Sequence, residues 1–71
     1  SAGEGTTKSE EASQLNDAGE MFYANGRYKQ AESAFVKAEK LYRENNDTSG
    51  FEYIQVISNQ ALLFHAMGRY D

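Results

Sequence analysis

The side chains best suited to acid–base chemistry are two carboxylates in the first half of the chain and one histidine near its end. Asp17 and Glu20 lie three positions apart, which places them on one side of a helix. A catalytic carboxylate needs burial to shift its pKa, and this side of the helix is polar, so we interpret the pair as surface charge. His65 has no carboxylate within one helical turn, so we expect neither a ligand site nor a pH switch there.

Other catalytic signatures are missing from the sequence. It contains no Cys, no second His and no Gly-rich phosphate loop ending in Lys followed by Ser or Thr. Without them, no nucleophile–base pair, metal cluster or nucleotide site can be recognised in the sequence. The sequence therefore predicts a protein that is not an enzyme and uses no cofactor or metal.

Length and charge narrow the class of protein further. The 71 residues suffice for one small domain, and the absence of Cys means that helix packing or a neighbour must stabilise it. A net charge of −4 disfavours nucleic acid, because phosphate binding needs clustered Lys and Arg. No apolar run approaches the about 18 to 20 residues that span a bilayer. We expect a soluble, cytoplasmic chain with no nucleic-acid or membrane partner.

These residues must be positioned by helices, and the first is predicted to begin near residue 9 or 10. Residues 1–8 are small and polar, which is typical of a flexible tail. Thr7 and Glu10 have the spacing of a capping box, and Ser9 is a competing N-cap. Asn25 and Gly26 favour the end of the helix. Its inward residues recur at steps of three and four: Leu15, Ala18, Gly19 and Phe22.

Two further helices are predicted at 28–44 and 51–67. Five turn-favouring residues between 45 and 50 separate them. Residues 51–57 are β-branched and aromatic enough for a strand, but helical spacing continues over more than three turns. The inward residues of the second helix are Tyr28, Ala31, Ala34, Phe35, Ala38, Leu41 and Tyr42, and those of the third are Tyr53, Ile54, Ile57, Ala61 and Phe64. A fourth helix would open at residues 69–71.

One motif occurs twice in the chain. Residues 22–28 read F-Y-A-N-G-R-Y, and 42 positions later residues 64–70 read F-H-A-M-G-R-Y. Each copy contains a helix end, a Gly turn and an aromatic restart. The duplication indicates a helical repeat in which one structural unit is used twice.

The first copy, with its flanking helices, resembles the tetratricopeptide repeat. The residues that carry the resemblance are Leu15, Gly19, Phe22, Gly26, Tyr28, Ala31, Phe35 and Ala38, followed in the second copy by Ile57, Ala61, Phe64, Gly68 and Tyr70. The resemblance covers residues 12–71, about one and a half repeats: repeat one at 12–45, a loop at 46–50, and the first helix of repeat two at 51–67. It implies an all-α fold, a helix hairpin plus a third helix, in which Gly19 and Ala31 allow close approach.

Two features depart from the usual pattern of that family. The Pro expected after the second helix is absent, and the period is 42 rather than the common 34 residues. The longer period is similar to that of kinesin light chains and related scaffolds, so we expect the additional residues at about 45–53.

The resemblance implies a non-catalytic scaffold that binds another polypeptide. Its concave face would carry Asn16, Glu20, Tyr23, Gln55, Asn59, Leu62 and His65. Some family members clamp acidic chaperone tails with Lys and Asn, but Asn16 and Glu20 occupy those places here. A carboxylate repels an acidic tail, so we predict weak or no binding to such tails and a neutral, basic or amphipathic peptide instead.

The last predicted helix is apolar on more than one face. We expect Val56, Leu63 and Met67 to face a missing fourth helix and to mediate self-association into a homo-oligomer. Two alternatives to a peptide-binding scaffold follow. The chain could be a structural element that caps or dimerises an array, or a different three-helix peptide-binding module such as the microtubule-interacting and trafficking domain.

Overall fold

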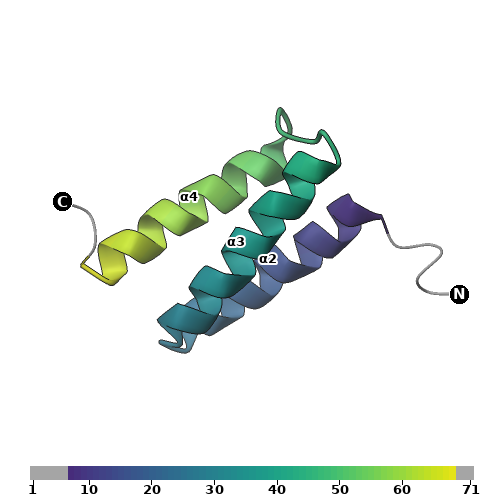
Figure 1. Cartoon of the computed structure of the whole chain (residues 1–71). Coiled ribbons are helices and arrows are strands. Elements are labelled where there is room, and N and C mark those ends of the chain that lie inside the picture. The colour runs from purple at the N-terminus through teal and green to yellow at the C-terminus, as the bar shows by residue number, and fades with distance from the viewer. Residues whose placement is uncertain (1–6, 69–71) are drawn as a thin grey trace, which may run out of the picture.

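A computed structural model describes residues 7–68, and within this range the chain forms three α-helices. These are α2 (Lys8–Ala24), α3 (Tyr28–Glu44) and α4 (Phe51–Ala66) (Figure 1). The all-α prediction is confirmed, including a helix where a strand was considered. Lys8, assigned to a tail, is helical. The rest of the predicted tail up to residue 6, and the proposed start of a fourth helix at 69–71, lie outside the described residues.

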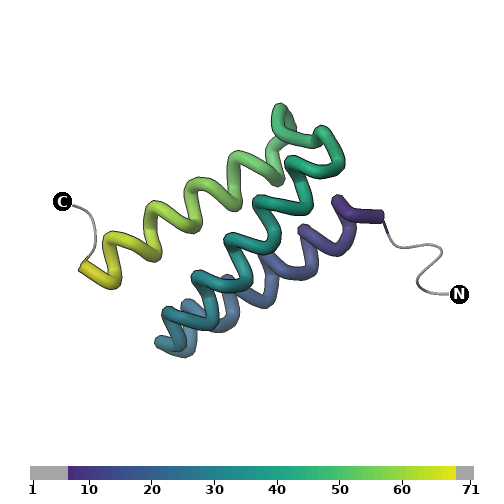
Figure 2. The backbone as a smooth tube through the Cα atoms, in the orientation of Figure 1, coloured from purple at the N-terminus to yellow at the C-terminus, as the bar shows by residue number. Residues whose placement is uncertain are grey.

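The helices are joined as two successive antiparallel hairpins. α3 packs against both other helices, so α2 and α4 run in the same direction (Figures 1 and 2). The core cluster of buried apolar side chains comes from all three helices: Ala12, Ala31, Phe35, Ala38, Tyr42, Val56 and Leu63. This arrangement places one side of α2 next to one side of α4, with α3 covering both.

The helix ends follow the predicted signals. At the start of α2, the Thr7 hydroxyl accepts from the backbone N–H of Glu10 at 3.0 Å, and the Glu10 carboxylate accepts from the N–H of Thr7 at 2.7 Å. Thr7 is therefore the N-cap, and Ser9 is not. Gly26 after α2 and Gly68 after α4 have φ values of 76° and 74°, which side chains disfavour.

At Gly19, α2 comes into close contact with α3. A Cβ atom built there would lie 2.5 Å from a ring carbon of Phe35, well inside contact distance. Phe35 is fully buried, with Ala31 and Ala38 buried one turn away on each side. Gly19 thus allows the expected close approach of the two helices, and the side chain that occupies the space next to it is Phe35, a pairing that was not predicted.

Polar contacts attach the start of α2 to the loop after α3. Ser9 donates to the Asp47 carboxylate at 2.8 Å and accepts from the Asn45 amide at 2.6 Å. Lys8 pairs with Glu44 at 3.4 Å. Because these contacts join residues more than 35 positions apart, they fix the loop that delivers the chain into α4.

The inward face of α4 differs from the prediction. Val56 and Leu63 are fully buried and Met67 is partly buried, so the prediction that these three residues face a missing helix is wrong. Ile54 and Ile57, predicted to face inward, are 57% and 39% exposed. Tyr53 packs edge to face on Tyr42 with ring centroids 6.4 Å apart, as a residue on the inner face should. Both faces of α4 are apolar, so spacing alone did not identify the inner one.

Candidate functional site

The strongest candidate for a binding surface is the side of the molecule where α2 and α4 meet. Asn16 of α2 is the buried polar residue of the described chain, with 5% of its surface exposed. Its side-chain oxygen accepts a hydrogen bond from the Asn59 amide of α4 at 3.0 Å. The same amide donates to the Glu20 carboxylate at 2.9 Å, and Asn16 donates to Glu20 at 3.5 Å. Asn59 thus connects two positions one turn apart on α2.

This polar triad is a direct side-chain link between α2 and α4, two helices that otherwise pack mainly on α3. The two N–H groups of the Asn59 amide can serve its two acceptors, and buried amides are costly unless bonded. Within residues 7–68, every buried side-chain polar atom has a partner. The triad therefore favours one register of α4 on α2, in addition to the packing of both helices on α3.

The remaining predicted site residues surround the triad. Tyr23 lies three positions after Glu20, is half-buried, and packs its ring on Tyr28 with centroids 5.6 Å apart. Gln55 and Leu62 lie one turn before and after Asn59 on α4, half-buried and exposed respectively. His65, one turn beyond Leu62, is exposed. Together with the triad, these residues are the surface that we call the α2–α4 face.

The two helices that form the α2–α4 face carry mostly acidic side chains, and Glu20 is the carboxylate that lies within the face itself. α2 carries four carboxylates, those of Glu10, Glu11, Asp17 and Glu20, and α4 carries that of Glu52. Lys8 is the sole Lys or Arg on these two helices. The basic side chains of the three helices are otherwise on α3: Lys29, Lys37, Lys40 and Arg43. The negative charge of α2 and α4, with Glu20 in the face, therefore favours positive charge over the α2–α4 face more than over α3.

The two carboxylates considered for acid–base chemistry have different environments. Glu20 accepts from both asparagines of the triad, whereas Asp17 is exposed. The groups brought to Glu20 are amide donors, which organise a carboxylate without supplying a proton shuttle. Among the described residues, no three His, Cys, Asp or Glu side chains are grouped so that they could hold a metal ion.

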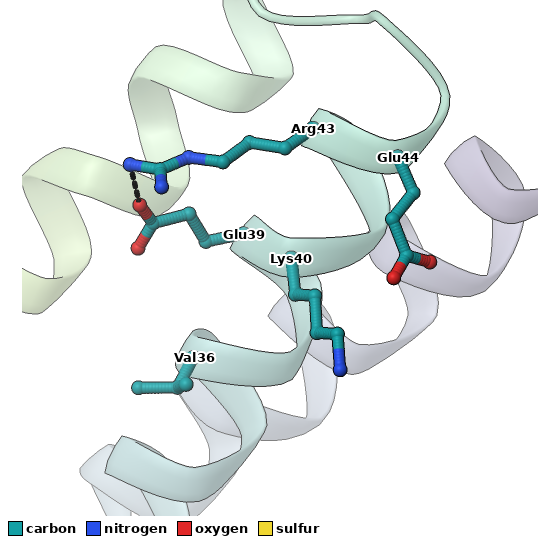
Figure 3. A pocket seen from close by; sticks show the side chains of 5 residues that line it. All are labelled: Val36, Glu39, Lys40, Arg43 and Glu44. Carbon is teal, nitrogen blue, oxygen red and sulfur yellow. Dashed lines mark ion pairs between the residues drawn. The ribbon is translucent and has the colours of Figure 1, made fainter.

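A second polar cluster joins α3 and α4 at a shallow depression of about 260 Å³ lined by Val36, Glu39, Lys40, Arg43 and Glu44 (Figure 3). Arg43 forms an ion pair with Glu39, which also accepts from Gln60 at 2.7 Å. The Arg43 guanidinium donates to the Tyr53 hydroxyl at 3.2 Å, and this bond together with Glu39 raises the pKa of Arg43. The side chains of this cluster bind one another, which suits a clasp between helices better than a ligand site.

Sequence reasoning named the triad residues but not their mutual contact, because Asn59 is 43 positions from Asn16. It also missed the contacts of Ser9 with Asn45 and Asp47, since Ser9 was considered only as an N-cap and the other two only as turn residues. No hydrogen-bond partner for these residues could be read from local spacing.

No protein-family model matches the chain, and neither curated proteins nor solved structures gave a significant match. The structure itself shows a small three-helix all-α domain. Of its described helices, none has the length and apolar character needed to cross a membrane.

Proposed function

We propose that the chain is a non-catalytic protein-interaction module of the tetratricopeptide type, which binds a peptide or helix on the α2–α4 face. The observation that carries the proposal is the Asn59 bridge to Asn16 and Glu20, since it brings candidate residues of the two sequence repeats onto one surface. The close approach of Gly19 to Phe35 and the repeated motif also support this class. The cytoplasmic location belongs to the same proposal.

The charge of the face defines the partner. Glu20 lies in the middle of the triad, so an acidic peptide tail would meet like charge next to a partly buried carboxylate. A basic or amphipathic peptide would gain charge-assisted hydrogen bonds there, with Tyr23 and Leu62 offering apolar contact. The partner is therefore a peptide with Lys or Arg flanking an apolar residue.

The test is a chemical-shift titration of the labelled protein with two peptides of equal length, one basic and amphipathic, the other acidic. The basic peptide is expected to shift Tyr23, Asn59 and His65. Glu20→Gln should weaken its binding several-fold, because one charge-assisted contact is lost. Glu11→Gln is the matched control, since nine positions place Glu11 on the opposite side of α2 from Glu20.

Two results would contradict the proposal. One is tighter binding of the acidic peptide, and the other is equal weakening by Glu20→Gln and Glu11→Gln, which would indicate a nonspecific charge effect. Shifts confined to Ile54 and Ile57 would favour the second candidate function, a structural element of a helical array. The exposure of these two apolar side chains on α4 is the observation that supports that candidate.

A further inference from the structure

The repeat relates each residue of α2 to a residue of α4 that lies 42 positions later. One row on α2 packs on α3, and it consists of Ala12, Leu15, Gly19 and Phe22. Its counterparts on α4 are Ile54, Ile57, Ala61 and Phe64, which we call the outer row of α4. Steps of three, four and three keep both rows on a single helix face.

The two rows differ in what covers them. Ala12 and Gly19 are buried against α3, whereas their counterparts Ile54 and Ala61 are exposed on the side of α4 that α3 does not cover. Ile57 is 39% exposed, and Phe64 is half-buried. A row that is covered by a helix in the first repeat is thus largely uncovered in the second.

The residue types on the opposite faces of α2 and α4 also differ between the two repeats. The face of α4 that packs on α3 contains Tyr53 and Val56, and their counterparts on α2 are Glu11 and Gln14, both exposed. α2 is therefore apolar toward one neighbour only, while α4 is apolar toward two. Exposing an apolar row of this length is unfavourable unless a partner covers it.

We propose that the outer row of α4 docks a partner helix with a small–aromatic–small stripe like that of Ala31, Phe35 and Ala38 on α3. The α2–α3 interface supplies the template, and the outer row continues its pattern into the next repeat. α4 has one carboxylate, Glu52, and no Lys or Arg, so apolar burial drives the docking.

The outer row is bulkier than its template. Ala61 has the Cβ atom that Gly19 lacks, and Ile54 replaces Ala12. A Cβ atom at Gly19 would clash with the aromatic ring of α3 at the present separation of α2 and α3. A partner helix that docks over Ala61 must therefore lie farther from α4 than α3 lies from α2. This docking surface is separate from the α2–α4 face and does not depend on the proposed function.

The experiment uses a peptide with the sequence of α3, residues 28–44, added in trans to the labelled full chain. The peptide should shift Ile54 and Ile57 saturably at submillimolar to millimolar concentration, since short helices are marginal in water. A control peptide with Phe35→Ser should lose the effect. In the chain, Ile57→Asp is expected to weaken binding at least about tenfold, and Val36→Asp, at an exposed apolar position on α3, should leave it unchanged.

Circular dichroism of both chain variants checks that the helices are retained. The proposal is overturned if the α3 peptide does not bind at millimolar concentration, or if Ile57→Asp has no effect on binding. Shifts confined to Ala12 and Leu15 would also overturn it, because they would mean that the peptide replaces α3 itself. Self-association of the chain through the outer row in the absence of peptide would overturn it as well, since the docked partner would then be a second copy of the chain. None of these outcomes involves the α2–α4 face.

Discussion

Replacing Gly19 by Ala tests the contact on which the helix hairpin depends. The new Cβ atom would lie 2.5, 2.7 and 3.0 Å from three ring carbons of Phe35, whereas ordinary contact begins at 3.4 Å. Phe35 is fully buried, and the neighbouring Ala31 and Ala38 leave no exposed side for its ring. The ring or the whole of α3 must therefore move by nearly an ångström.

Two opposing effects set the size of the change. Ala is a better helix former than Gly by about 1 kcal/mol, which favours the variant. Overpacking a core costs about 1 to 3 kcal/mol, and the short distance at Gly19 places this case near the upper limit. The net loss of unfolding free energy is about 2 kcal/mol, roughly a 30-fold shift toward the unfolded chain. For a domain of this size the melting temperature should fall by roughly 8 to 16 °C.

The assay is urea and thermal unfolding followed by circular dichroism. Ser33→Ala, at an exposed position of α3, is the matched control and should be neutral or slightly stabilising, because it changes helix propensity without a clash. In a Phe35→Leu background the cost of Gly19→Ala should shrink, since the ring that it meets is gone. Stabilisation by Gly19→Ala, or an equal cost in both backgrounds, would refute the reasoning.

Three further predictions concern the cap, the core and the ionisation of a buried phenol. Thr7→Ala removes the capping box of α2 and should cost about 1 kcal/mol in urea unfolding, against little change for Thr48→Ala in an exposed loop. Val56→Ala should cost about 2 kcal/mol because it leaves a cavity against α3, whereas Ile54→Ala on the exposed side should change stability by less than about 0.5 kcal/mol; equal costs would contradict the inner face described here. Burial, followed by nearby carboxylates, raises the pKa of Tyr42 above its usual 10.0, so the folded state favours the neutral phenol. This contribution to the unfolding free energy is complete below pH 10 and is lost as the pH rises through the folded pKa. The decrease in unfolding free energy between pH 8 and pH 11 should therefore be smaller in Tyr42→Phe than in the unmodified protein. An equal decrease in both proteins would refute the assignment.

Signals between near neighbours in the sequence predict the three helices and much of the first hairpin. Each helix is specified by signals within a few residues, such as the Thr7–Glu10 box and the glycines at 26 and 68. The close approach of two helices at Gly19 was also expected, from the resemblance, because a residue without a side chain lets helices come together, whereas its contact with Phe35 emerged only from the structure. Local geometry is sufficient for these features, since caps and helix periodicity depend on neighbours along the chain.

The tertiary structure alone decided which face of α4 turns inward. Two rows of apolar residues satisfy the same helical period, one containing Val56 and Leu63 and the other Ile54 and Ile57, and either could have packed on α3. The choice is made by contacts from distant segments: Tyr42 against Tyr53, and Asn16 with Glu20 against Asn59. Rotating α4 to bury the other row would break the hydrogen bonds of Asn59 to Asn16 and Glu20. The residue spacing within α4 gives no information about the loss of these bonds, because their partners lie on another helix.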